Sequence, residues 1–321
     1  MRKLQCNNVT SLLLKSSLVY SKTLDYIIPI FTRLRELKMD GLMLIDDFIP
    51  FFVKSLPLLE CMEARRMFNL WKPQIVSSSS SSSSSSSCTL RIIRFVNCPR
   101  LVGLRNIPPS LELLDLSGSS IDGINFNNLM QAIKGSSLTS LVLQRCRKLA
   151  YTIDQQIQQD GNAEKWLYLK DLHNIVHIDV RYCQHIKHVM ISDCPQLRDF
   201  QITYCYGLES LVLRKTIIKR LELTMLENLK NLKITDCGML NYLDLQGCIN
   251  LNDMFGADFA NNENDDHTFD NHVRRNLLST LPLVSEVQCS NLRAIRWIDG
   301  SKKKFTRGVW IKENNNVIIN V

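Results

Sequence analysis

The chain has 321 residues, of which 45% are hydrophobic, and a formal net charge of +8. This apolar content is ample for a core and excludes wholesale disorder, while a charge of this size permits acidic partners without requiring nucleic acid. The basic N-terminal stretch has an apolar run of only Leu12 to Leu14, too short for a secretory signal, and no stretch approaches the ~20 apolar residues of a membrane span.

Residues 1–76 carry long repeat units, which start at Val9, Leu34 and Leu59. Leu56 fits the third start almost as well as Leu59. The second halves of the units, SKTLDYIIPIFTRL and LIDDFIPFFVKSLPLL, have an apolar spacing compatible with a short helix. This part of the chain is therefore predicted to hold N-terminal repeats that each contain a strand and a helix.

The unbroken serine run at 77–87 lacks the apolar groups that offset chain entropy, so we expect a disordered insertion there. Residues 88–256 are predicted to form the core of the repeat array. The pattern L-x-x-L-x-L-x-x-C-x-x-L runs from Ile175 to Leu251 at steps of eleven residues, with a single step of ten. Upstream it recurs with longer spacers, in units that start at Leu90, Leu111 and Leu138. A polar insertion is expected near 152–170.

Each L-x-L triplet of this pattern predicts a short strand whose alternate side chains point inward. One unit cannot bury its own apolar edge, so the next coil covers that edge and extends a parallel ladder. Two of the short units make one flat coil of about 22 residues, a usual length for such repeats. The predicted fold class is an α/β to mostly β solenoid, with a parallel strand ladder and eleven-residue half-coils in its second half.

The last part of the chain departs from the regular pattern. Residues 257–273 are acidic and rich in asparagine, which predicts a loose loop. Residues 274–321 hold the last repeat and β-rich runs, separated by turn signals at Asp299-Gly300 and at Asn314 to Asn316. We expect these runs to form a β-rich C-terminal cap, because a strand array needs a closed edge.

The residues of the repeated pattern resemble the leucine-rich repeat family, in its cysteine-containing variety. Units such as LKNLKITDCGMLNYLDLQGCINL also look like the C-terminal repeats of intracellular immune receptors. The resemblance covers roughly residues 9–298 and implies a solenoid fold, but it says little about function. The eleven-residue period departs from typical cysteine-containing repeats, which place a helix between strands, and this argues against a helical outer face in the second half.

The cysteines of the second half, such as Cys183 and Cys205, occupy one position of the pattern, where other units have Thr216 and Leu226. A row of zinc ligands would not tolerate leucine, and structural zinc cysteines usually lie two to four residues apart. Stacked coils would bring Cys183 within disulfide range of Cys205, but the missing export signal favours reduced thiols. We therefore expect free thiols that pack as small apolar groups, with no metal and no cofactor.

The motifs of nucleotide-binding and hydrolytic enzymes are absent, so we expect neither catalytic residues nor an enzyme. His267 and His272, with nearby aspartates, are a candidate metal cluster, but the composition of their loop favours solvated acid. The run Lys302 to Lys304, with Trp297 and Phe305, would suit RNA or phosphate. The same lysines are typical of a soluble edge hairpin.

The residues that flank the inward pair of each strand face outward, and those on one side are the candidate partner-binding residues. They are His177, Asp179, Arg181, Asp199, Gln201, Arg220, Glu222, Tyr242 and Asp244. Their middle row, from Asp179 to Asp244, would repel itself across the ladder and would attract a basic partner. A solvated polar sheet face is the simpler interpretation. On the opposite side the register turns His188 outward.

The leading hypothesis is a non-enzymatic scaffold or adaptor that binds another protein on this strand face. One alternative is the substrate-recognition part of a ubiquitin-ligase complex, which would need an F-box-like segment before Val9, where the repeats leave no room. The other is RNA or phosphate binding through the basic C-terminus. We expect a monomeric solenoid or a subunit of a complex, in the cytoplasm or also the nucleus, with no membrane contact and with protein rather than nucleic acid as the partner.

Overall fold

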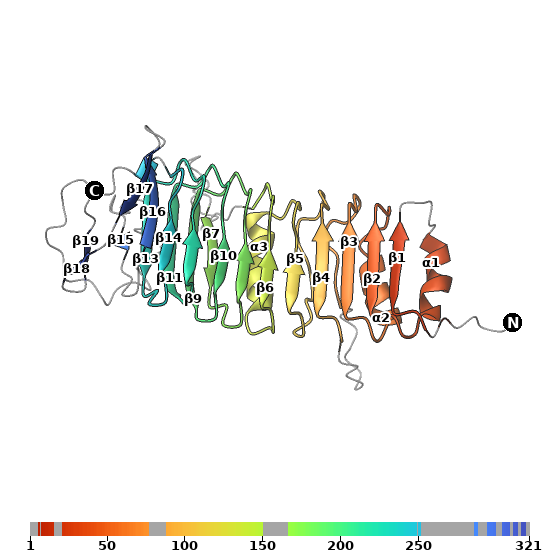
Figure 1. Cartoon of the computed structure of the whole chain (residues 1–321). Coiled ribbons are helices and arrows are strands. Elements are labelled where there is room, and N and C mark those ends of the chain that lie inside the picture. Colours follow the sequence, from red (N-terminus) through yellow and green to blue (C-terminus); the bar gives the residue numbers. More distant parts are fainter. Residues whose placement is uncertain are drawn as a thin grey trace.

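The computed structural model describes residues 6, 8–15, 21–76, 88–149, 166–248 and 250–251, and beyond them the backbone of five short strands between 286 and 318. Its coils stack into an elongated, nearly straight solenoid (Figure 1). The expected serine insertion at 77–87 and the expected acidic loop at 257–273 lie outside the described residues.

One long face of the solenoid carries one parallel strand from each coil, and the strands Asp199–Gln201 and Arg220–Glu222 are in contact but belong to separate sheets (Figure 1). We call this row of strands the first ladder. Its strands are β1 (Ser11–Lys15), β2 (Glu36–Asp40), β3 (Cys61–Arg65), β4 (Ile92–Val96), β5 (Leu113–Asp115), β6 (Ser140–Val142), β8 (His177–Asp179), β10 (Asp199–Gln201), β12 (Arg220–Glu222) and β14 (Tyr242–Asp244). The register pairs Glu36 with Cys61. Leu34 and Leu59, rather than Leu56, therefore hold equivalent positions in their coils.

A second parallel ladder completes the later coils. Its strands are β7 (Trp166–Lys170), β9 (His188–Cys194), β11 (Ser210–Thr216), β13 (Asn231–Thr235) and β15 (Glu286–Val287). His177 pairs with Asp199 in the first ladder and His188 with Ser210 in the second, so one coil comprises 22 residues and each half-coil forms a strand. β7 lies at the end of the range 152–170 that the sequence assigns to an insertion, and its Leu167 is buried as in a regular ladder strand.

Helices replace the second strand in the early coils and in one central coil. They are α1 (Ser21–Ile27) with the 3-10 turn η1 (Ile28–Ile30), α2 (Phe48–Ser55) and α3 (Gly123–Ile133). The first two helical segments confirm the sequence prediction, and α3 is an addition to it. The Asp122 carboxylate caps α3 by accepting a hydrogen bond from the backbone N–H of Asn125 at 2.9 Å. Phe126, Leu129 and Ile133 bury one face of this helix.

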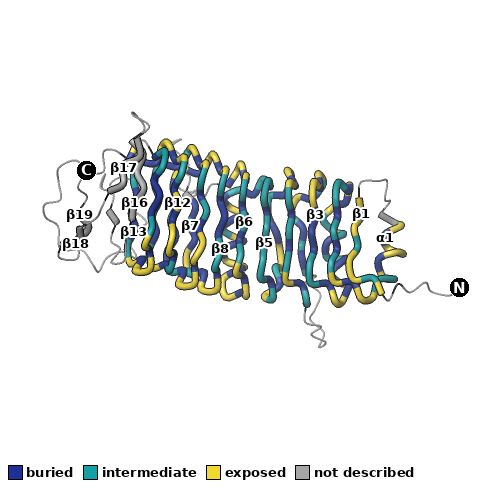
Figure 2. The backbone as a smooth tube through the Cα atoms, viewed as in Figure 1, coloured by how far each residue is buried: buried dark blue, intermediate teal, exposed yellow. Residues whose placement is uncertain are grey.

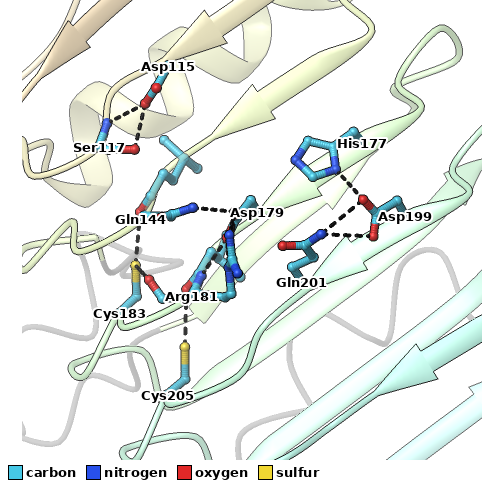
Figure 3. Close-up of polar contacts among 12 residues, drawn as sticks. Asp115, Ser117, Gln144, His177, Asp179, Arg181, Cys183, Asp199, Gln201 and Cys205 are labelled. Atoms are coloured by element: carbon cyan, nitrogen blue, oxygen red, sulfur yellow. Dashed lines mark hydrogen bonds and ion pairs between the residues drawn. The ribbon is translucent and has the colours of Figure 1, made fainter.

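The cysteine position of the pattern closes each coil corner. The thiol of Cys183 donates a hydrogen bond to the carbonyl oxygen of Leu143 at 3.0 Å, and the thiol of Cys205 donates to that of Val180 at 3.1 Å (Figure 3). Each acceptor belongs to the preceding coil, so the thiol ties two coils together. Burial raises the pKa of Cys205 to about 12. All ten described cysteines are free, which confirms the predicted packing role of those in the pattern.

The residue just before the cysteine position adopts a left-handed backbone at each described corner from Gly41 onward. Its φ is 63° at Tyr182, 61° at Tyr204 and 79° at Gly247. This conformation turns the chain sharply at the end of the strand, so that the next side chain points into the core. Thr216 and Leu226 fill the same position without a thiol and are equally buried.

The described C-terminal strands extend and close the first ladder. β16 (Ala294–Asp299) pairs in parallel with β14, and β17 (Lys304–Gly308) pairs antiparallel with β16. β18 (Ile311–Glu313) and β19 (Asn316–Ile318) form a separate antiparallel pair. The change from parallel to antiparallel pairing marks the end of the repeats, as expected for a β-rich cap.

Candidate binding face

The nine predicted residues lie on or beside four neighbouring strands of the first ladder, β8, β10, β12 and β14. The register places His177 beside Asp199 and Glu222 beside Asp244, and β10 lies next to β12. Residues that are up to 67 positions apart in the chain thus share one face, because each coil returns to the ladder at the same point. We call this surface the strand face.

Asp179 points outward but is covered by its neighbours (Figure 3). Its side chain is only 3% exposed. Two guanidinium nitrogens of Arg181 bind its carboxylate, with the shortest contact at 2.7 Å, and the Gln144 side-chain amide donates a further hydrogen bond at 2.5 Å. The pKa of Arg181 is raised by its hydrogen bond to this carboxylate. The predicted repulsive acidic row therefore does not exist at this residue, since its charge is already neutralised.

The other carboxylates of the strand face are also engaged within the chain. The Asp199 carboxylate lies 2.6 Å from Nδ1 of His177 and accepts a hydrogen bond from the Gln201 side chain at 3.1 Å (Figure 3). Arg220 pairs with Glu222 at 2.7 Å, and this pair is well exposed, at 60% and 51% of the two side chains. Asp179 and Glu222 are thus paired with arginines, while Asp199 is held by a histidine and an amide.

Tyr242 and Asp244 lie at the C-terminal end of the strand face. The Tyr242 hydroxyl donates to the Asp244 carboxylate at 3.2 Å, and the backbone N–H of Gln246 donates to the other carboxylate oxygen at 3.1 Å. The guanidinium of Arg220 lies 4.1 Å from the centre of the Tyr242 ring. Such contacts fix the side chains before any partner arrives, which lowers the entropic cost of binding.

The strand face continues toward the N-terminus beyond the residues singled out in the sequence. Ion pairs recur there, such as Lys38 with Glu36 at 2.8 Å. Half-buried apolar side chains then occupy the outward positions of the central coils: Ile92, Val96, Leu113 and Val142. All of these side chains occupy the same flanking positions of the pattern as the nine predicted residues. The repeat period would therefore have located them too.

The opposite side of the coil is less open than the register indicated. His188 and Ser192 are each only 7% exposed, and Ser210 is 1% exposed. The interpretation of His188 as an ordinary surface residue is therefore wrong. A side chain that points outward from a strand is not necessarily exposed, because side chains of neighbouring coils can cover it.

The described residues offer little to a metal or a small substrate. Among them, no group of three His, Cys, Asp or Glu side chains is placed to hold a metal ion, and the candidate cluster around His267 and His272 lies outside them. A pocket beside Gly135 and His173 has a volume of about 10 Å³, room for one water molecule. No helix in the described parts of the chain is both long and apolar enough to cross a bilayer.

Comparison with known proteins adds a structural likeness. No family model matches the chain, and no curated protein matches it. Among solved structures, the leucine-rich repeat domain of the type III effector XopL is similar with a TM-score of 0.40 and 19% sequence identity, over 76% of this chain and 71% of that one. The strand ladders themselves define the class: this chain is a repeat solenoid with a leucine-rich-repeat-like fold, an architecture typical of protein-binding scaffolds.

Proposed function

We propose that the protein is a non-enzymatic scaffold or adaptor that binds another protein on its strand face. The observation that carries this proposal is the long outward surface of the first ladder, on which the exposed pair Arg220 and Glu222 stands among side chains already held by hydrogen bonds and ion pairs. A surface of this length suits a macromolecule rather than a small substrate, and solenoids commonly bind partners on such surfaces.

The ion pairs indicate how a partner would be recognised. The charges of Arg220 and Glu222 are exposed but balanced by each other, so a partner gains from matching their arrangement rather than from bulk attraction. The partner expected here presents complementary charges of both signs at one-coil spacing, about 4.8 Å. Asp179 holds the side chains of Arg181 and Gln144 in place, and its buried carboxylate does not contact the partner.

A charge-swap variant tests this proposal. Arg220→Glu combined with Glu222→Arg keeps the ion pair and the net charge but reverses its polarity, so stability holds while partner binding falls by tenfold or more. Proteins captured from cells by the wild-type chain are compared with those captured by the swap, and the lost partner is then titrated as a purified protein. The matched control is the swap Lys187→Glu with Glu209→Lys, since this pair lies off the strand face at 3.1 Å.

Equal binding of every captured protein by wild type and swap would refute the strand face as the binding surface. The same capture separates the two alternatives from the sequence. Ubiquitin-ligase subunits among the retained proteins would indicate a substrate receptor, and ribonuclease-sensitive capture would indicate RNA. Light scattering of the purified chain tests the proposed monomeric state.

A further inference from the structure

A second candidate surface lies on one edge of the solenoid, where the strands of the first ladder end. Figure 2 shows that exposed residues gather at the coil corners, whereas the strands between them are more covered. Most of the exposed large apolar side chains belong to this edge. They are Met43, Ile45, Phe68, Trp71, Tyr182, Tyr204, Tyr206 and Met225. We call the part of this edge from Arg145 to Tyr206 the arc edge.

The arc edge carries an ordered stack of side chains. The rings of Tyr182 and Tyr204 lie 4.9 Å apart and within 2° of parallel, and the guanidinium of Arg145 lies 5.3 Å from the centre of the Tyr182 ring. Tyr206 packs edge-on against Tyr204 at 6.4 Å. The three tyrosines remain 36% to 39% exposed. The stack therefore presents a fixed aromatic surface to solvent.

The fold itself does not require aromatic residues at these corners. Tyr182 and Tyr204 have φ of 63° and 61°, a conformation that costs a side-chain-bearing residue about 1 kcal/mol and costs glycine nothing. Gly118 and Gly247 fill the equivalent corners of other coils with φ of 71° and 79°. Most other described corners carry polar or charged residues with the same backbone, so the tyrosines differ from them in the aromatic ring and not in φ.

Positive charge adjoins the tyrosines. Arg145, Arg147 and Lys148 are exposed at the corner just before the stack, and within the described residues none of the three has an ion-pair partner. By contrast, Lys187 lies 3.1 Å from the carboxylate of Glu209. Because no acidic side chain in the described part of the chain pairs with these cations, they favour a negatively charged ligand.

The spacing of these groups sets the shape of that ligand. Arg147 and Tyr206 hold the same position in coils two steps apart, so about 10 Å separates them along the edge. An extended peptide covers that distance in about three residues. A segment with carboxylates about three residues from an apolar or aromatic side chain would therefore meet both features at once.

Nucleic acid fits this surface less well. Arg145 comes from the preceding coil and Tyr204 from the following one, so both faces of the Tyr182 ring are covered. A base could not stack there, although stacking supplies much of the affinity for single strands. What Tyr182 leaves exposed is its ring edge and hydroxyl, groups that suit peptide carbonyls, carboxylates and apolar side chains.

We propose that the arc edge is a docking site for an acidic, extended segment of another protein, with its carboxylates on Arg145, Arg147 and Lys148 and an apolar or aromatic side chain against Tyr204 and Tyr206. This surface is separate from the strand face. Neither proposal depends on the other, because each surface can be altered by substitutions that leave the other surface intact.

The test is selection of random dodecapeptides displayed on phage against the full chain, followed by fluorescence anisotropy with synthetic copies of the enriched peptides. The expected result is enrichment of Asp and Glu about three residues from an aromatic or large apolar residue. Arg147→Glu with Lys148→Glu then weakens binding tenfold or more, and Tyr204→Ala with Tyr206→Ala weakens it several-fold. Binding also falls as salt rises.

The matched control is Arg198→Glu with Lys219→Glu, which reverses two exposed cations where the strands of the first ladder begin, on the opposite edge. This variant should bind the peptides about as well as wild type, apart from a small effect of net charge. Three outcomes would overturn the proposal. They are no enrichment above background, enriched peptides without acidic residues, or a loss of binding in the control variant equal to that in the Arg147 and Lys148 variant. Tighter binding of a twelve-nucleotide uridine RNA at the same residues would replace the acidic peptide with nucleic acid.

Discussion

Alkaline pH should destabilise this protein through its buried thiols. Burial raises the pKa of Cys98, Cys146 and Cys194 to about 11 and that of Cys205 and Cys248 to about 12, from an ordinary value of 9.0. Because the folded pKa is the higher one, the protonated thiol stabilises the folded chain fully below pH 9. That contribution is lost as the pH rises through the window from about 9 to 12.

The loss is large because several thiols act together. Between pH 9 and the folded pKa, each thiol lowers the free energy of unfolding by about 1.4 kcal/mol per pH unit. Five of them amount to about 7 kcal/mol at pH 10, which is comparable with the whole stability of a typical domain. Urea unfolding followed by circular dichroism, under reducing conditions at pH 8 and pH 10, measures this decline.

Lysines and tyrosines also titrate in this range, so a variant isolates the thiol. Cys205→Ala should cost about 1–2 kcal/mol at pH 8, through the lost hydrogen bond to Val180 and the space left behind. At pH 10 this cost should shrink by about 1.4 kcal/mol, since the variant has no thiol to ionise. Leu211→Ala, a core control without a titrating group, should cost the same at both values. An unchanged cost for Cys205→Ala would refute the buried protonated thiol.

Three further predictions concern the corners and the strand face. Gly207→Ala should destabilise the chain by about 1–3 kcal/mol in thermal unfolding, because the new Cβ would lie 2.2 Å from the carbonyl oxygen of Gln184. Gly135→Ala is the control: its Cβ would meet no neighbour, so it should cost only about 1 kcal/mol for its positive φ. Asp179→Asn should cost about 1–3 kcal/mol through the loss of Arg181 as an ion-pair partner, while Glu222→Gln, at a 51% exposed side chain, should stay within about 0.5 kcal/mol. Leu226→Cys should cost less than Leu226→Ala in urea unfolding, since cysteine suits that corner; a larger cost would contradict the interpretation of the position as a packing site.

The repeat period predicted the ladders well because it is a local property of the chain. Leu-x-Leu triplets set the direction of each strand, and a coil length of 22 residues follows from two units. The sequence did not predict the helix α3, because its cap, Asp122, lies in a serine-rich stretch at 117–123 that continues the repeat pattern. The apolar spacing from Phe126 to Ile133 does carry a helical signal.

The character of the strand face could be predicted only in part. Alternation along β8 places His177 and Asp179 on the outside, as the structure has them. Whether Asp179 is available depends on lateral cover by Gln144, which lies 35 residues earlier in the chain, and on the rotamer of Arg181. The sequence period holds no information on such contacts between side chains, so it could not show that the Asp179 carboxylate is buried and paired.

The coil corners also determine how the protein would respond to force. The corner at Tyr182 is fastened in both directions: its backbone N–H donates forward to the carbonyl oxygen of Thr203, and the thiol of Cys183 donates backward to that of Leu143. A solenoid pulled at its ends would therefore peel one coil at a time, as the bonds of each corner yield in turn. In the later coils such a step would release about 75 Å of extended chain per 22 residues, whereas the 25-residue coils from β1 to β3 would release about 85 Å, so the steps would differ along the solenoid.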